Sequence, residues 1–174
     1  MTVGAATLEA RLGACLACHG ANGQSGIPEV PSLGGQPLFH LTVQLLMLRD
    51  KLRVFEPMNQ AMQGLTDDDL RSLAAHLAKL PPPKPVGGPI DQERMERARA
   101  LIEQHRCNFC HQQNFSGEQN VPRLASQRED YLVKAMREYK NNARRGYDAS
   151  MADVLYPISD EQISDLAYFL AHLH

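Results

Sequence analysis

Apolar residues recur every three or four positions along several stretches of the chain, the spacing that places them on one face of a helix. Shorter stripes of this kind cover Leu8 and Leu12 near the start and residues 95–102 in the second half. No stretch shows the strict alternation of apolar and polar residues that indicates a strand. The pattern therefore predicts an all-α fold. The clearest stripe predicts a helix with one buried face and consists of Leu38, Leu41, Leu45, Leu48 and Leu52.

Two later helices begin with the same start signal. Residues 66–69 read "TDDD" and residues 159–162 read "SDEQ". In each, a hydroxyl side chain and an acidic or amide side chain three residues later form a capping box, which satisfies free N–H groups at a helix start. Apolar residues flank each cap at the spacing of a hydrophobic staple. Each stretch therefore predicts the start of a helix, one in each half of the chain.

The chain repeats itself with an offset of 91 to 93 residues. The stretch "EVPSLGGQ" at 29–36 resembles "NVPRLASQ" at 120–127. The stretch "LTDDDLRSLAAHLAKL" at 65–80 resembles "ISDEQISDLAYFLAHL" at 158–173. Two cysteine-containing motifs are related by the same spacing. Three matches in one order indicate two copies of one structural unit.

The segment between the two copies, "LPPPKPVGGP" at 80–89, is rich in proline and glycine and predicts a linker. We therefore expect a first domain over 1–80, a linker over 81–90 and a second domain over 91–174. Each domain has only about 80 residues, a size at which a metal or a cofactor often has to support a thin core.

Composition and charge exclude several classes of protein. Of the 174 residues, 43% are hydrophobic and 22% are charged, which is typical of a soluble globular chain. The net charge of −2 argues against nucleic-acid binding, which requires a basic face. No apolar run reaches the 18 residues or so of a membrane span. The start "MTVGAATLEA" lacks the features of a signal peptide, so we expect either a cytosolic protein or a mature form.

All four cysteines lie in two short motifs, "CLACHG" at 15–20 and "CNFCHQ" at 107–112. A disulfide framework would connect distant loops, whereas each pair here is only three residues apart. A zinc ribbon would need its second pair within about 20 residues, and a thioredoxin-like pair would need a βαβ pattern. None of these alternatives requires a histidine directly after the second cysteine of both motifs.

Covalent haem attachment does require that histidine. Cysteines at positions i and i+3 face the same side of a helical turn, so both sulfurs can reach one haem, and Cys-x-x-Cys-His is the signature of c-type haem. The sequence therefore predicts two covalently bound haem c groups, with His19 and His111 as iron ligands. The expected attachment residues are Cys15, Cys18, Cys107 and Cys110.

The sixth iron ligand decides the kind of function, because a second protein ligand favours electron transfer and an open position favours catalysis or gas binding. Met58 lies seven residues before Leu65, and Met151 lies seven residues before Ile158, so the repeat makes the two methionines equivalent. We predict that both are iron ligands. Met62 is the main rival, although the second copy has no methionine at its position, and any methionine can instead fill a core.

Two prolines follow the ligand histidines at nearly equal distances. Pro31 lies 12 residues after His19, and Pro122 lies 11 residues after His111. A metal-bound histidine usually donates its other N–H to a carbonyl or a carboxylate, and a proline carbonyl is a candidate acceptor. The alternative is an ordinary turn proline. We also expect two leucines to pack against the haem edges, namely Leu33 and Leu124.

Both halves resemble class I cytochrome c domains, and the whole chain resembles the dihaem cytochrome c4 family. The matching features are "CLACHGANG", "VPSLGGQ" and Met58 before "LTDDDL", followed by "CNFCH", "VPRLASQ" and Met151 before "ISDEQI". The resemblance implies two tandem domains related by a pseudo-twofold axis, with haem propionates near the interface. It also implies that Pro31 and Pro122 accept from the ligand histidines.

The resemblance implies a periplasmic electron carrier of a Gram-negative bacterium, soluble or loosely associated with the membrane. Such a protein passes single electrons from a quinol-oxidising cytochrome complex or a periplasmic dehydrogenase to a terminal oxidase. The alternatives are a small dihaem enzyme, such as a peroxidase or a sulfur-compound dehydrogenase with one open or labile haem, and a haem subunit that accepts electrons from one dehydrogenase.

Three features depart from the pattern or are left unexplained by it. The second copy has Ala125 and Ser126 where the first has two glycines, and His76 stands where the family tends to have an aromatic residue. We expect His76 to be a surface or packing residue. A basic cluster could bind propionates or steer an acidic partner, but we favour a solvated helix face. The cluster comprises Lys134, Arg137, Lys140, Arg144 and Arg145.

Overall fold

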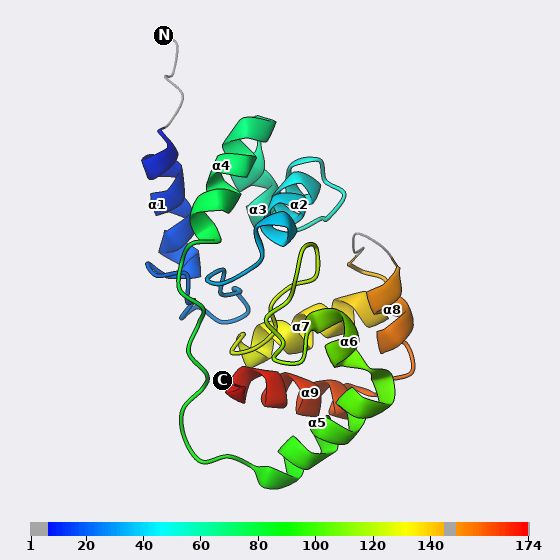
Figure 1. Ribbon diagram of the computed structural model, residues 1–174. Coiled ribbons are helices and arrows are strands. Elements are labelled where there is room, and N and C mark those ends of the chain that lie inside the picture. The colour runs from blue at the N-terminus through cyan, green and yellow to red at the C-terminus, as the bar shows by residue number, and fades with distance from the viewer. Residues whose placement is uncertain (1–6, 145–148, 174) are drawn as a thin grey trace.

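The computed structural model describes residues 7–144 and 149–173, and within these ranges the chain forms helices and no strand (Figure 1). The first four helices make one unit and the last five make another, which confirms the prediction of an all-α protein with two domains. Among these helices, none is long and apolar enough to cross a membrane. In chain order they are α1 (Leu8–His19), α2 (Leu38–Arg49), α3 (Glu56–Met62), α4 (Asp67–Leu77), α5 (Gln92–His105), α6 (Cys107–His111), α7 (Glu129–Lys140), α8 (Ser150–Leu155) and α9 (Asp160–His172).

Both predicted capping boxes are present. The Thr66 hydroxyl accepts from the N–H of Asp69 at 3.2 Å, and the Asp69 carboxylate accepts from the N–H of Thr66 at 2.9 Å. Ser159 and Gln162 make the same pair of bonds at 3.1 and 2.8 Å. Because these bonds satisfy backbone donors that a helix start leaves free, they fix where α4 and α9 begin.

The leucine stripe of the first domain is shorter than predicted. Leu41, Leu45 and Leu48 are buried in the core, but Leu38 is exposed at the start of α2. Leu52 lies beyond the end of the helix and is 64% exposed. The chain turns away there through Lys51, whose φ of 55° is left-handed and cannot continue a right-handed helix. Of the predicted pair at the start of the chain, only Leu12 is buried.

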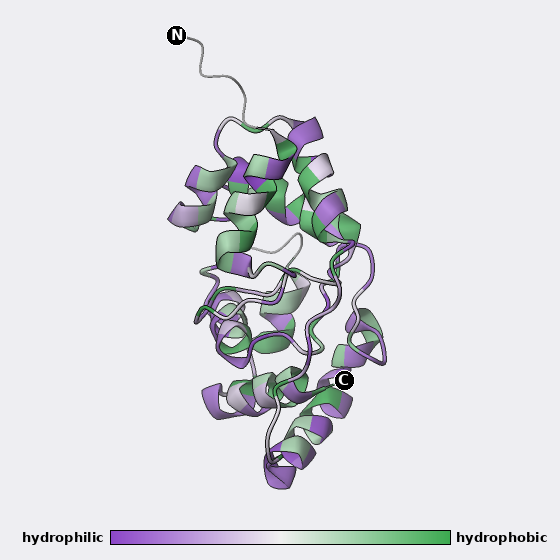
Figure 2. Ribbon diagram, turned by 90° about the vertical axis from the view of Figure 1, so that its left-hand side faces the viewer, coloured by the Kyte–Doolittle hydropathy of each residue, from purple (hydrophilic) through white to green (hydrophobic). Residues whose placement is uncertain are grey.

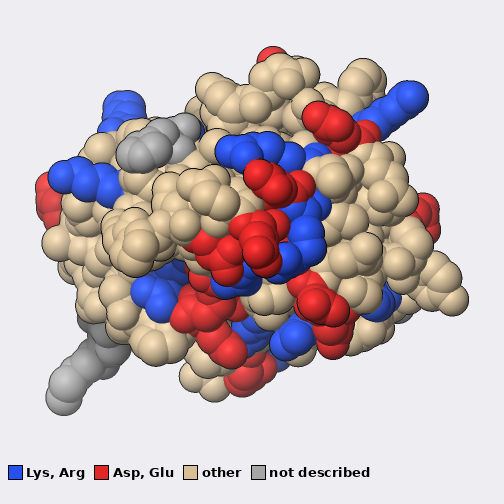
Figure 3. All heavy atoms as spheres, turned by 90° about the horizontal axis from the view of Figure 1, so that it is seen from below, with Lys and Arg blue, Asp and Glu red and all other residues tan. Residues whose placement is uncertain are grey.

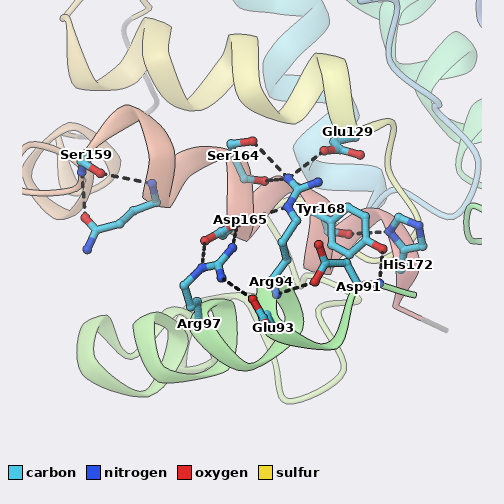
Figure 4. A network of polar contacts seen from close by, with 11 residues as sticks. Asp91, Glu93, Arg94, Arg97, Glu129, Ser159, Ser164, Asp165, Tyr168 and His172 are labelled. Carbon is cyan, nitrogen blue, oxygen red and sulfur yellow. Dashed lines mark hydrogen bonds and ion pairs between the residues drawn. The ribbon is translucent and has the colours of Figure 1, made fainter. Parts of the chain in front are cut away.

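The second domain is built on the crossing of α5 and α9, whose apolar faces enclose its core (Figure 2). The Asp165 carboxylate of α9 lies between two arginines of α5 (Figure 4). It accepts from Arg97 Nε at 2.6 Å and from Arg94 Nε at 3.1 Å. Arg94 also reaches Glu129 of α7 at 3.1 Å, so one polar network joins three helices. In the first domain, α1 and α2 pack against α4.

The two domains meet through a reciprocal pair of glutamines. The Gln127 side chain accepts from the N–H of Ser32 and donates to the C=O of Ser32, both at 2.8 Å. The Gln36 side chain accepts from the N–H of Arg123 at 3.0 Å and donates to its C=O at 2.9 Å. Residue 127 is the repeat counterpart of residue 36, and residue 123 that of residue 32, so the contact has pseudo-twofold symmetry.

The segment over 81–90 has no helix, and it is bonded to both domains. The Gln24 side chain donates to the C=O of Lys84 and accepts from its N–H, both at 3.2 Å. Farther along, the N–H of Val86 donates to the C=O of Ala171 at 3.0 Å. The segment therefore does not behave as a free tether in this structure, because hydrogen bonds hold its middle against each domain in turn.

The contact between this segment and the first domain accounts for the glycine pair that the second copy lacks. A Cβ on Gly34 would lie 2.0 Å from the carbonyl oxygen of Pro81, which is too close for any side chain. In the second domain the equivalent Ala125 is buried within its own core, and the Ser126 hydroxyl donates to the C=O of Leu173 at 2.7 Å. The difference at these positions thus follows from the packing of the segment after α4.

Candidate haem sites

The first cysteine motif forms the end of α1. Cys15 is half-buried and Cys18 is exposed, and both lie on the last turns of the helix, which ends at His19. Gly20 follows with a φ of 86°, and a Cβ there would meet the carbonyl oxygen of Gln24 at 2.0 Å. The glycine therefore allows the chain to leave the helix directly after the histidine.

The second motif has its own short helix, α6. Arg106 has a left-handed φ of 51° and separates α5 from α6, whereas the first motif continues its helix without a break. Cys107 is half-buried and Cys110 is exposed, as at the first site. Burial raises the pKa of the Cys107 thiol, as it raises that of Cys15. None of the four sulfurs is in a disulfide, so each is free to carry a covalent group.

The two histidines have the same surroundings. His19 and His111 are 6% and 5% exposed, and the Nδ1–H of each ring faces a proline carbonyl. The Nδ1···O distance is 2.8 Å from His19 to Pro31 and 3.0 Å from His111 to Pro122. Burial lowers the pKa of both imidazoles, and the carbonyl opposes that shift. A neutral ring whose Nδ1 is engaged in this way offers its Nε2 lone pair to a metal.

Both methionines of the predicted pair lie in the first turn of a short helix. Met58 is the third residue of α3, and Met151 is the second residue of α8. Each is half-buried and packs against the edge of its own domain's core, as do Leu33 and Leu124. Met62, by contrast, is 1% exposed and fully enclosed in the core of the first domain.

His76 is exposed on the last turn of α4, as expected. Members of the predicted basic cluster have different partners. Lys134 pairs with Glu29 of the other domain at 2.7 Å, and Arg137 pairs with an acidic residue of α9. Arg144 is 8% exposed, so the prediction of a solvated face is wrong for it. Arg145 lies outside the described residues.

Arg144 belongs instead to a partly buried polar cluster between the domains, which the sequence analysis missed. Its Nη1 donates to the Tyr131 hydroxyl at 3.0 Å, and its Nη2 reaches Gln44 Oε1 at 3.4 Å. Arg53 donates to the same Gln44 oxygen at 2.9 Å. His40 completes the cluster, with its Nδ1 at 3.0 Å from a backbone oxygen of the other domain. The repeat relates residue 53 to residue 144 and residue 40 to residue 131. This equivalence is the sequence signal that could have revealed the cluster.

This cluster is strongly cationic. No carboxylate within the described ranges forms an ion pair with Arg53 or Arg144, and Arg144 Nε is buried without a hydrogen-bond partner there. Burial raises the pKa of Tyr131, but the neighbouring guanidiniums of Arg144 and Arg53 lower it to about 8. Burial and the same cations lower the pKa of His40 to about 4. A buried Arg144 with an orphan N–H, beside the half-buried Arg53, is suited to anionic groups such as carboxylates.

The residues therefore fit two covalent haems. Each domain offers two thiols three residues apart on a helical turn and a neutral histidine directed by a carbonyl. Half-buried apolar side chains border each core, and the interface offers cations for propionate carboxylates. When bound, a haem iron supplies a couple that takes up or releases one electron.

Comparison with known proteins gives the same result. The family model for cytochrome c matches the chain twice, over residues 4–81 and 95–174. Cytochrome c4 of Pseudomonas aeruginosa is 27% identical over 98% of this chain and 89% of its own. The crystal structure of reduced recombinant cytochrome c4 from Pseudomonas stutzeri superposes with a TM-score of 0.83, at 25% identity over 98% of this chain and all of that one.

A further relative is the thiosulfate dehydrogenase electron acceptor of Thiomonas intermedia, which is 29% identical over 90% of this chain and 77% of its own length. Two family matches, each containing a complete Cys-x-x-Cys-His motif, mean that the protein carries two covalently bound haem c groups and takes part in electron transfer. The chain belongs to the cytochrome c family, as a protein of two such domains that resembles cytochrome c4 over nearly its whole length.

Proposed function

We propose that this protein is a carrier of single electrons in which each iron has one histidine and one methionine ligand. His19 and Met58 bind one iron, and His111 and Met151 bind the other. Two strong protein ligands close the iron to substrates, and the soft thioether of methionine raises the reduction potential. Cys15, Cys18, Cys107 and Cys110 attach the haems, and the domains extend over 1–80 and 91–174.

The observation that carries this proposal is the equivalent placement of Met58 and Met151. Both lie in the first turn of a short helix, and both are half-buried at the edge of a core that the same domain's leucine, Leu33 or Leu124, also borders. An iron ligand needs such a position, because its sulfur has to reach out of the core. The rival Met62 is fully enclosed by protein.

The interface cations support a place for the haem propionates. We propose that Arg53 and Arg144 bind propionate carboxylates of the two haems, with Tyr131 and His40 beside them. The buried Arg144 Nε without a described partner favours this assignment, since an unpaired buried donor is costly. The two arginines and the propionate carboxylates would therefore neutralise one another, since either charge alone would be costly to enclose between two domains.

The test of the ligands combines optical spectroscopy with a redox titration. The oxidised wild type should show two low-spin haems and the methionine–iron charge-transfer band at the red end of the visible spectrum. Changing Met58 to Ala should halve that band and lower the potential of one haem, and changing Met151 to Ala should do the same for the other. Changing Met62 to Ala is the matched control, which should destabilise the domain but keep the band.

If Met62→Ala removes the band and Met58→Ala does not, the assignment of the first ligand is wrong. A high-spin haem in the wild type would overturn closed ligation and favour an enzyme with an open site. Binding of carbon monoxide to the reduced wild type at neutral pH would have the same meaning, because a retained methionine blocks the gas.

We further propose a periplasmic location. As donors we propose a quinol-oxidising cytochrome complex or a periplasmic dehydrogenase, and as acceptor a terminal oxidase. The likeness to cytochrome c4 supports this circuit. The likeness to a thiosulfate dehydrogenase electron acceptor supports a second candidate, an accepting partner of one sulfur-compound dehydrogenase. Reduction kinetics with thiosulfate and its dehydrogenase, compared with a quinol-oxidising complex, distinguish the two.

The charge distribution bears on how partners approach. Acidic and basic side chains are interleaved over the face seen from below in Figure 1, where no single sign dominates (Figure 3). On α5, for example, Arg97 pairs with both Glu93 and Asp165. A partner with a strongly charged docking surface would gain little at the centre of this face, because acidic and basic side chains lie next to one another there.

A further inference from the structure

The reciprocal glutamines at the interface contact the same peptide groups that orient the iron-ligand histidines. The carbonyl of Pro31 accepts from His19, and the N–H at the other end of that peptide bond belongs to Ser32. That N–H donates to the Gln127 side chain at 2.8 Å. A peptide group is planar and conjugated, so its two ends act as one unit. Gln127 of the second domain thus bonds the peptide that holds the histidine of the first.

The second site has the mirror arrangement. The carbonyl of Pro122 accepts from His111, and the N–H of the same peptide group belongs to Arg123. That N–H donates to the Gln36 side chain, from the first domain, at 3.0 Å. Each domain therefore contributes a glutamine that bonds the peptide group orienting the other domain's histidine, and the two arrangements are equivalent in the repeat.

These bonds lie away from water, and hydrogen bonds are electrostatically stronger there than in solvent. Gln127, Gln36 and Ser32 are all buried. Inside a protein, hydrogen bonds in a chain polarise one another, so an acceptor on the N–H makes the carbonyl of that peptide a better acceptor. A stronger bond from the carbonyl to Nδ1–H makes the histidine a more basic ligand, and a more basic ligand favours the oxidised iron.

We propose that Gln127 and Gln36 are positioning residues that act crosswise on the haems. Gln127 tunes the iron bound by His19, and Gln36 tunes the iron bound by His111. The proposal rests on the two histidines being iron ligands. It follows that separation of the domains would shift both potentials, because the peptide group that orients each histidine would lose its glutamine bond from the other domain.

The test replaces each glutamine by methionine, which has a similar length and no hydrogen-bonding amide. In Gln127→Met, the redox titration should show an upward shift of the potential of the first haem only. NMR of the reduced protein should show a weaker hydrogen bond at the Nδ1–H of His19 and an unchanged one at His111. Gln36→Met should give the opposite pattern. The matched control is Gln24→Met, which removes a reciprocal amide pair on Lys84 and should move neither potential.

A second variant separates tuning from mere loss of structure. In Gln127→Glu the side chain still accepts from Ser32 N–H, and as a carboxylate it accepts more strongly. The bond at His19 Nδ1–H should therefore strengthen, opposite in sign to the methionine variant. If Gln127→Met fails to fold, the hydrogen bond at His19 Nδ1–H in Gln127→Glu, compared with that in the wild type, still tests the proposal.

Three results would overturn the proposal: a shift of the haem in the variant's own domain, equal shifts of both haems, or the same sign for both variants at the histidine proton. A high-spin wild type would instead refute the proposed ligation, which is a separate outcome visible before any glutamine is changed.

Discussion

Asp165 joins α5 to α9, and its replacement by asparagine tests whether that contact stabilises the second domain. The carboxylate is 5% exposed and accepts three bonds from two guanidiniums, at 2.6 and 3.2 Å from Arg97 and at 3.1 Å from Arg94. Asparagine keeps one acceptor oxygen and turns an N–H₂ group towards the arginines. The variant thus loses the charge and at least one of the three bonds.

The size of the effect follows from the exposure of the partners. Hydrogen bonds to charged groups contribute about 1.5–3 kcal/mol, whereas a fully buried pair loses about 3–5 kcal/mol when one partner is removed. The side chain of Arg97 is 51% exposed and that of Arg94 is 24% exposed, so water can solvate both after the change. We therefore expect Asp165→Asn to lower the free energy of unfolding of the second domain by about 2 kcal/mol.

Urea unfolding of the haem-loaded protein, followed by far-ultraviolet circular dichroism and by the haem absorption bands, measures this loss. With a slope of about 1–3 kcal/mol per molar urea, the midpoint of the second domain should fall by about 1 M. The control is Asp160→Asn, which removes an exposed pair with Arg137 at 3.6 Å and should cost less than about 1 kcal/mol. Equal midpoints for the two variants would refute the reasoning.

The dependence on pH adds a check of sign. Arg97 and then Arg94 hold the pKa of Asp165 below its usual range, against the effect of burial. A carboxylate with a lowered pKa stabilises the folded state above its unfolded pKa of about 4, and this stability is lost as the pH falls through the folded pKa. The difference between wild type and Asp165→Asn should therefore be full at pH 7 and shrink towards pH 3.

Two more stability predictions concern the first domain. Gly34→Ala should destabilise that domain by about 3 kcal/mol, because its Cβ would lie 2.0 Å from the carbonyl oxygen of Pro81. Ala125→Gly in the second domain should cost only about 1 kcal/mol. Equal shifts of the urea midpoint in the two variants would argue against the clash. Asn59 is buried, and its side chain makes two hydrogen bonds to the segment before α3 and one to the carbonyl of Leu48 in α2. We therefore expect Asn59→Ala to cost about 1–3 kcal/mol. Asn59→Ala should also release Met58 from its iron at a lower urea concentration than in the wild type, so that half of the charge-transfer band is lost first. Loss of the band from both haems at the same urea concentration would contradict this.

The sequence predicted the features that depend on neighbours a few residues apart. The two Cys-x-x-Cys-His motifs, the capping boxes of α4 and α9 and the equivalence of Met58 with Met151 are all patterns within one turn or one repeat. The all-α fold followed from helical periodicity for the same reason, although Leu52 shows that a periodic stripe can run past the end of its helix.

Only the tertiary structure decided which side chains serve the other domain. Arg144 looks like part of a basic helix surface in the sequence, yet it is buried between the domains because residues about 100 positions away cover it. Gln36 and Gln127 end the two repeated stretches at 29–36 and 120–127, but nothing local indicates their partners, which lie 87 and 95 residues away along the chain. A sequence pattern records what a residue needs from its own helix or loop, and the packing of two domains determines the rest: which buried donors and acceptors meet, and which charges remain without an opposite partner.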